Sequence, residues 1–177
     1  EQIEDSFRRL FMEKNESGRL VCTLNLDGLQ GGKLPTLPPG LNFDHIEHLS
    51  LKNMAQGDDL AYFLKSFKQV VSLELDGNQL TRMPEVLSQM PRLTHLSLAR
   101  NRIKLTEQTL SKLGNLRTLR TLILDKNPLG ATLKVEKLAD LRTLCLNDTH
   151  ATELPLGLQR LPHLDWVDLR NNEIKDL

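Results

Sequence analysis

Apolar and polar residues recur along this chain in a fixed order, with a period of 22 to 26 residues. The clearest unit begins at Val70 and carries Leu73, Leu75 and Leu80, with Asn78 between the last two. The alternation at Leu73 and Leu75 predicts a short strand whose two leucines face the same side. One such strand cannot bury its leucines alone, so successive units are expected to stack into a parallel sheet over one aliphatic core.

Seven units can be aligned by their apolar positions 1, 4 and 6. They begin at Val21, Ile46, Val70, Leu93, Leu119, Leu141 and Leu164. Position 9 is Asn in four units, and it is Leu29, Met54 or Thr149 in the other three. An Asn amide both donates and accepts hydrogen bonds, so it can bond neighbouring backbone where the chain turns. The three replacements cannot do so fully, and we expect their turns to be looser or differently built.

This order of residues is that of leucine-rich repeats, whose units are roughly 20 to 29 residues long. The sequence therefore predicts an α/β fold, a leucine-rich-repeat solenoid. We expect a curved right-handed stack with a parallel sheet on its concave face and short helices or extended segments on its convex face. Two returning segments have helical patterns. One follows Asp58 and Asp59, either of which can cap it, and the other runs from a Thr106 cap to Gly114.

Residues 1–14 have a different pattern. Four apolar residues lie on one face of a predicted amphipathic helix: Ile3, Phe7, Leu10 and Phe11. Since the end of a solenoid must be covered, we expect this helix to be an N-terminal cap, followed by a repeat domain of about seven units over residues 15–177. No comparable cap follows the last unit. Either the natural protein continues past residue 177, or that residue is an artificial boundary.

Charge and cysteine content narrow the classes of partner. Lys+Arg and Asp+Glu number 23 each, whereas nucleic-acid binders and polybasic membrane modules usually carry a basic surplus. No apolar run approaches the ~20 residues needed to cross a bilayer, and no signal-peptide pattern opens the chain.

Cys22 and Cys145 belong to units 1 and 6, about 24 Å apart at the usual strand spacing. A disulfide needs Cα atoms within ~7 Å, so we expect free thiols, as in a reducing compartment.

Positions 3, 5 and 7 of each unit are expected to point outward on the concave face. Near the C-terminal end, Ile123, Cys145 and Trp166 are the apolar residues at these positions, and on strands ~4.8 Å apart they can form one diagonal patch. Trp with Arg nearby is typical of interface anchors. Alternatively, Trp166 packs against a C-terminal continuation of the chain. The partner-binding residues predicted on this face are His48, Glu74, His95, Arg120, Ile123, Asp125, Arg142, Cys145, Trp166, Asp168 and Arg170.

The sequence predicts no catalytic residue, no metal ligand and no cofactor. His48 and His95 occupy the same position two units apart, ~10 Å by strand spacing, whereas zinc ligands lie within ~2.1 Å of the ion. Neither cysteine has an obvious histidine base. The acidic residues of the concave face are spread over many strands, so we interpret them as a solvated polar surface that can steer a basic partner.

Two stretches carry a closer resemblance. Residues 70–103 and 164–172 resemble the repeats of large secreted effectors of Gram-negative bacteria, in which a C-terminal ubiquitin-ligase domain of the novel type follows the repeats. The resemblance implies a secreted protein acting in the host cytoplasm, whose repeats select a substrate and can restrain the ligase domain. The ligase nucleophile of that family is a Cys followed by Asp. Cys22 and Cys145 are followed by Thr23 and Leu146, so no catalytic residue carries over.

The main hypothesis from the sequence is therefore a substrate-recognition domain that binds a protein, with no enzymatic activity of its own. The alternative is a structural or regulatory scaffold whose repeats bind only neighbouring domains of their own protein. A third, weaker alternative is a free-standing enzyme that uses a cysteine. The sequence identifies neither the partner nor the oligomeric state.

Overall fold

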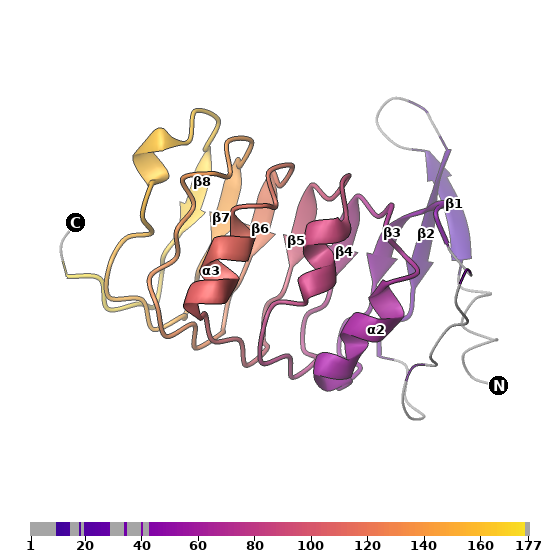
Figure 1. Cartoon of the computed structure of the whole chain (residues 1–177), viewed down its shortest axis with the longest axis horizontal. Helices are drawn as coiled ribbons and strands as arrows, with labels where there is room; N and C mark the ends of the chain where they lie inside the picture. Colours follow the sequence, from indigo (N-terminus) through magenta and orange to yellow (C-terminus); the bar gives the residue numbers. More distant parts are fainter. Residues whose placement is uncertain are drawn as a thin grey trace.

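One sheet runs through the whole described part of the chain, which comprises residues 10–14, 18, 20–28, 34, 40 and 43–175 of a computed structural model. Its eight strands lie side by side in chain order along the long axis of the molecule (Figure 1). They are β1 (Leu10–Lys14), β2 (Leu20–Asn25), β3 (Ile46–Ser50), β4 (Ser72–Glu74), β5 (His95–Ser97), β6 (Thr121–Ile123), β7 (Thr143–Cys145) and β8 (Trp166–Asp168). Strands β2 to β8 are parallel and each belongs to one repeat unit, as the periodicity predicts.

The leucines at position 4 form the centre of the core. In consecutive strands Leu73, Leu96, Leu122 and Leu144 are register partners, and all four are fully buried. The unit starts align as expected from Ile46 onward. In β2 an irregularity between Cys22 and Thr23 places Cys22, instead of the preceding residue, opposite Ile46. The prediction of a shared aliphatic interior is confirmed.

The returning segments lie on the other side of this core (Figure 1). They include α2 (Leu60–Leu64), α3 (Glu107–Leu113) and three 3₁₀ segments, at Gly57–Asp59, Glu85–Gln89 and Leu158–Arg160. Thr106 caps α3 as predicted, because its hydroxyl accepts from the backbone N–H of Thr109 at 3.2 Å. Neither predicted aspartate caps α2 through its side chain. Asp58 instead accepts from the backbone N–H of Thr81 at 3.0 Å, so it joins two units.

In four units an asparagine at position 9 connects the unit to its neighbours. The Oδ1 atom of Asn101 accepts from the N–H groups of Asn78 (2.9 Å) and Leu80 (3.1 Å). Its Nδ2 donates to the carbonyls of Leu75 (3.2 Å) and Leu98 (2.9 Å). Asn78, Asn127 and Asn172 bond in the same way. These bonds satisfy backbone groups that the turn would otherwise leave buried and unpaired.

Unit 6 has a differently built turn, as predicted for a position 9 without Asn. The Thr149 hydroxyl donates to the carbonyl of Leu146 in its own unit at 3.1 Å. A hydroxyl has one proton to donate, whereas the Asn amide has two, so Thr149 cannot also bond unit 5. The turn at Met54 is completed from the next unit, since Asn78 Oδ1 accepts from the N–H of Met54 at 3.1 Å.

The N-terminal prediction is wrong for residues 10–14, which form strand β1 and no helix. β1 pairs antiparallel with β2, with Met12 opposite Cys22. A strand fits here because the first parallel strand has an edge of unpaired backbone groups, and another strand can pair with them. The rest of the predicted helix, residues 1–9, lies outside the described residues. Within the described part, no helix is long and apolar enough to span a bilayer.

Candidate functional site

The concave face presents three columns of outward side chains, as predicted. Position 3 aligns Thr23, His48, Ser72, His95, Thr121, Thr143 and Trp166, and position 5 aligns Asn25, Ser50, Glu74, Ser97, Ile123, Cys145 and Asp168. Position 7 lies two residues after the end of each strand from β2 to β8. The predicted site residues Arg120 and Arg142 directly precede β6 and β7 and are exposed at the edge of the sheet where the strands begin.

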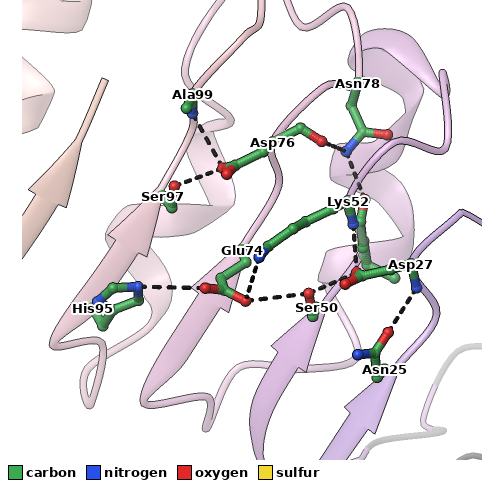
Figure 2. Close-up of polar contacts among 11 residues, drawn as sticks. Asn25, Asp27, Ser50, Lys52, Glu74, Asp76, Asn78, His95, Ser97 and Ala99 are labelled. Carbon is green, nitrogen blue, oxygen red and sulfur yellow. Dashed lines mark hydrogen bonds and ion pairs between the residues drawn. The ribbon is translucent and has the colours of Figure 1, made fainter. Parts of the chain in front are cut away.

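In the first half of the face, over β2 to β5, outward side chains of neighbouring units are hydrogen-bonded to each other (Figure 2). We call this part of the face the closed half. Asp27 Oδ1 accepts from the Ser50 hydroxyl at 2.6 Å and from the backbone N–H of Lys52 at 2.7 Å. Two units later, Asp76 Oδ1 accepts from the Ser97 hydroxyl at 2.6 Å and from the backbone N–H of Ala99 at 3.2 Å. In each case a position 7 aspartate bonds positions 5 and 7 of the following unit.

Sequence reasoning missed this Asp–Ser link, although the pattern is present in the chain. Ser50 follows Asp27 by 23 residues, and Ser97 follows Asp76 by 21 residues, close to one repeat in each case. Both serines are buried despite their outward position. A search for Ser one repeat after each position 7 Asp would have found the pairs.

Glu74 lies at the centre of this half, between the side chains of His95 and Lys52 (Figure 2). Its carboxylate is 3.8 Å from His95 Nε2 and 3.3 Å from Lys52 Nζ. These neighbours, His95 first and then Lys52, lower the pKa of Glu74 from 4.5 to about 2 against the opposing effect of burial. The 3.8 Å separation is an ion-pair distance and exceeds that of a hydrogen bond. The predicted site residues Glu74 and His95 therefore bind each other.

The second half of the face, over β6 to β8, lacks the serine of the link. Ile123 and Cys145 occupy position 5 and are half-buried. Asp125 still accepts from the backbone N–H of Asn147 at 2.9 Å, but the residue at the serine position is now Cys145. Burial raises the pKa of Asp125, and burial together with the carboxylates of Asp125 and Asp168 raises the pKa of the Cys145 thiol. A thiol with a raised pKa is a poor nucleophile.

Trp166 is the large apolar side chain of this half. It is 61% exposed and lies opposite Thr143 on the neighbouring strand, one diagonal step from Cys145. Ile123, Cys145 and Trp166 are thus brought onto three adjacent strands, as predicted. Asp168 and Arg170 instead bind each other, with Arg170 Nη2 donating to Asp168 Oδ2 at 2.9 Å. Arg170 lowers the pKa of Asp168 by this bond.

The structure also places the residues considered for other chemistry. His48 and His95 share a column with Ser72 between them. Within the described residues no three His, Cys, Asp or Glu side chains are grouped as metal ligands would be. Cys22 on β2 and Cys145 on β7 form no disulfide, as the strand count predicts.

The chain was compared with known sequences. No family model matches it. It is 32% identical over 112 residues to an uncharacterised leucine-rich repeat-containing protein of Schizosaccharomyces pombe, a match to 63% of this chain and 14% of that protein. It is also 32% identical over 162 residues to a putative disease resistance protein of Arabidopsis thaliana, covering 87% of this chain and 17% of the relative. The chain thus spans less than a fifth of either relative.

Solved structures with the same arrangement come from bacteria and a plant. A Leptospira interrogans leucine-rich-repeat protein superposes with a TM-score of 0.64 at 24% identity, over 87% of this chain and 44% of the other. An internalin of Listeria monocytogenes gives 0.55 at 17% identity, over 75% and 37%. The repeat ectodomain of an Arabidopsis thaliana membrane receptor kinase, solved in complex with CASPARIAN STRIP INTEGRITY FACTOR 2, gives 0.50 at 20% identity, over 93% and 26%.

Proposed function

Because this chain has the leucine-rich-repeat fold, which serves protein interaction, we propose that it is a protein-binding domain whose contact surface is the concave face of units 5 to 7. One observation supports the choice of this half above all others. Trp166 is 61% exposed beside the half-buried Ile123 and Cys145, on a part of the face whose outward side chains are not linked as those of the first half are.

The chemistry of these side chains suits protein recognition. Exposed Trp contributes disproportionately to binding energy when a partner covers it, because a large rigid apolar surface leaves water. The strand backbone here is already paired within the sheet, so a partner contacts side chains and does not add a strand between these strands. Arg120 and Arg142 stand at the border of the patch, where polar groups set the orientation of a partner.

A pair of variants tests this proposal. Trp166→Ala should weaken partner binding by about 2 kcal/mol, roughly 30-fold. Tyr62→Ala is the matched control, because Tyr62 is 63% exposed and lies on α2, away from the concave face. Proteins retained from a cell lysate by the wild type and by Tyr62→Ala, but lost with Trp166→Ala, are measured by quantitative mass spectrometry and then by titration. If no retained protein depends on Trp166, the proposed surface is wrong.

As a narrower proposal, the domain is the substrate-recognition region of a bacterial effector with a ubiquitin-ligase domain, acting in the host cytoplasm. The resemblance of units 3, 4 and 7 to such effectors supports it, and the two free thiols are compatible with a reducing compartment. The test is the natural full-length protein. It should carry a domain with a Cys–Asp catalytic pair and form ubiquitin conjugates, and a full-length protein without ubiquitin-transfer activity would contradict the proposal.

In the scaffold alternative, the partner is a neighbouring domain of the same protein and not a separate protein. Trp166 on β8 would then contact a neighbouring domain of the same protein. In that case Trp166→Ala changes the activity or domain arrangement of the full-length protein and leaves external partners unchanged. Cross-linking of the full-length protein, read by mass spectrometry at the lysines nearest β8, separates the two arrangements.

A further inference from the structure

The middle of the chain is strongly basic, although the whole chain is neutral. Residues 92–142 contain 11 Lys or Arg against 4 Asp or Glu, a net charge of +7 within a chain whose net charge is zero. This section comprises units 4 and 5 and the start of unit 6. Part of this charge is paired, since Arg92 contacts Glu47 and Lys112 contacts Glu85, both outside the section; the unpaired part can attract anionic groups.

Basic side chains of this section border the concave face on two sides. We call the two borders the strand-end rim, made of Arg100, Arg102 and Lys126, and the strand-start rim, made of Arg120 and Arg142. All five residues are exposed. Among the described residues, none of the five forms an ion pair. Their charges are therefore not neutralised by the chain itself there, unlike those of Lys52 and Arg170.

Two of these five residues, Arg100 and Lys126, have a strained backbone conformation. Position 8 of every unit has a left-handed backbone, with φ between 56° and 71°. The residues there are Gly28, Asn53, Gly77, Arg100, Lys126, Asp148 and Asn171. Gly, Asn and Asp tolerate this conformation, whereas long side chains adopt it at a cost.

The strain cannot be relaxed locally, because the same turn is required in every unit. The N–H of Arg100 donates to the carbonyl of Asp125 and that of Lys126 to the carbonyl of Asn147, both at 2.8 Å. Gly77 makes the equivalent bond to Ala99 at 3.0 Å. Asn or Gly would make these bonds with less strain, so the bonds do not explain the choice of Arg and Lys. Ala55, Gln79, Leu129 and His150 also have a left-handed backbone, so this conformation alone does not indicate function. What distinguishes Arg100 and Lys126 is that each keeps an exposed positive charge at such a position.

We propose that the two basic rims hold an acidic segment of a protein partner, which crosses the concave face of units 4 to 6. This rests on the proposed function and adds the chemical class of the partner. From Arg120 to Lys126 the chain advances six residues, about 20 Å. An extended segment of similar length places carboxylates at both rims and an apolar side chain over Ile123, which lies midway.

A protein fits this surface better than a nucleic acid does. The Asp125 carboxylate lies between the rims and repels a phosphate chain, whereas a protein segment can present a neutral residue there. Among the outward positions of units 4 to 6 in the described sheet, the aromatic ring is the imidazole of His95, which lies 3.8 Å from the Glu74 carboxylate, and a carboxylate at that place repels a nucleic acid. Acidic side chains spaced along a protein segment match two separate rims, and an unbroken row of phosphates does not.

Panning a random peptide library displayed on phage against the full chain supplies the probe. We expect the enriched peptides to carry Asp or Glu on both sides of an apolar residue. The double variant Arg100→Asn/Lys126→Asn should bind them roughly fivefold more weakly at low salt and should raise the Tm by about 3 °C. Gain of stability with loss of binding is a result that a merely structural role for the two residues cannot give.

The matched control removes two positive charges elsewhere. Lys68→Asn/Arg160→Asn changes exposed residues outside the basic section and should leave both binding and Tm unchanged. Arg100→Lys/Lys126→Arg keeps the charges and should keep the affinity.

Five results would overturn the inference. Enriched peptides that depend on Trp166 but lack acidic residues would leave the proposed function standing and refute the acidic partner. Unchanged peptide affinity in the Arg100→Asn/Lys126→Asn variant, or a fall in its Tm, would refute the role of the rim. A single-stranded DNA oligonucleotide that binds as tightly as the peptides and competes with them would show a nucleic-acid site instead. Failure to enrich any peptide would count against both proposals.

Discussion

The two halves of the concave face have the same strand pattern, but their outward side chains have different hydrogen-bond partners. Over β2 to β5, Asp27 and Asp76 each bond a serine and a backbone N–H of the next unit. Over β6 to β8, Asp125 has only the backbone N–H of Asn147 in the equivalent place, because the residue at the serine position is Cys145. The first half is closed by its own hydrogen bonds, and the second half keeps apolar groups at its surface.

The contrast shows how few residues separate a face whose polar side chains are hydrogen-bonded from one that keeps apolar side chains at its surface. The residue type at position 5 decides whether the neighbouring aspartate gains a side-chain bond in addition to its bond with a backbone N–H. Where serine is present, the polar groups have partners, and displacing them would cost a binding protein their desolvation. Where Ile123 and Cys145 replace it, a partner covers apolar surface with less to displace.

The largest loss in the free energy of unfolding is expected from substitutions in the turns that follow the strands. Asn101→Ala removes an amide that serves two N–H groups and two carbonyls of the buried turn. Several buried polar groups then lose their partners at roughly 1–3 kcal/mol each, so we expect the free energy of unfolding to fall by about 4 kcal/mol in urea titration. Thr149→Ala removes one hydroxyl donor and should lower it by about 1 kcal/mol.

The reverse substitution checks that result. Thr149→Asn gives unit 6 the amide present in unit 4 and should stabilise the protein modestly. Equal losses in Asn101→Ala and Thr149→Ala would mean that the asparagine amide stabilises its turn no more than the threonine hydroxyl does.

Glu74→Gln should lower the free energy of unfolding at neutral pH. His95 and Lys52 lower the pKa of Glu74 to about 2, so its ionised form stabilises the fold above the unfolded pKa of 4.5, and this contribution is lost as the pH falls towards 2. Since the side chain is about a third exposed and screened by water, we expect a loss of only ~1 kcal/mol at pH 7. The difference between wild type and variant should vanish in urea titrations between pH 5 and pH 2. A difference that persists at pH 2 would point to packing instead of charge.

The smallest effect is expected when the second half is converted to the first. Cys145→Ser places a hydroxyl next to Asp125, as Ser97 is placed next to Asp76. The new bond should lower the raised pKa of Asp125 and stabilise the fold by about 0.5 kcal/mol at neutral pH. This gain should disappear as the pH falls and Asp125 becomes protonated. NMR titration of the Asp125 carboxyl carbon measures the shift, and an unchanged pKa would show that burial alone controls this group.

The same substitution should also weaken a partner that contacts the apolar patch. Ser97→Ala is the complementary change in the first half, and it should destabilise the fold without creating a binding surface. If Cys145→Ser and wild type bind a Trp166-dependent partner equally, Cys145 lies outside the contact.

The sequence by itself determined the sheet, its register and the outward columns. Leucines repeated every 22 to 26 residues can be buried together only when successive units stack in register, so the position of each outward residue follows from its number in the unit. The asparagine ladder followed in the same way, since a buried amide at each turn must find backbone partners. The patch of Ile123, Cys145 and Trp166 was predicted for this reason.

Only the tertiary structure decided which outward groups bind each other and which remain open to a partner. Asp27 meets Ser50, and Glu74 meets Lys52 and His95, across distances that depend on how neighbouring units are aligned. Residues 10–14 became a strand because the edge of β2 offered backbone partners, which their own helical pattern does not reveal. Likewise, the left-handed turn at Arg100 and Lys126 is imposed by bonds to the next unit. Local sequence specifies what each unit buries, and contacts between units specify what the assembled surface leaves free.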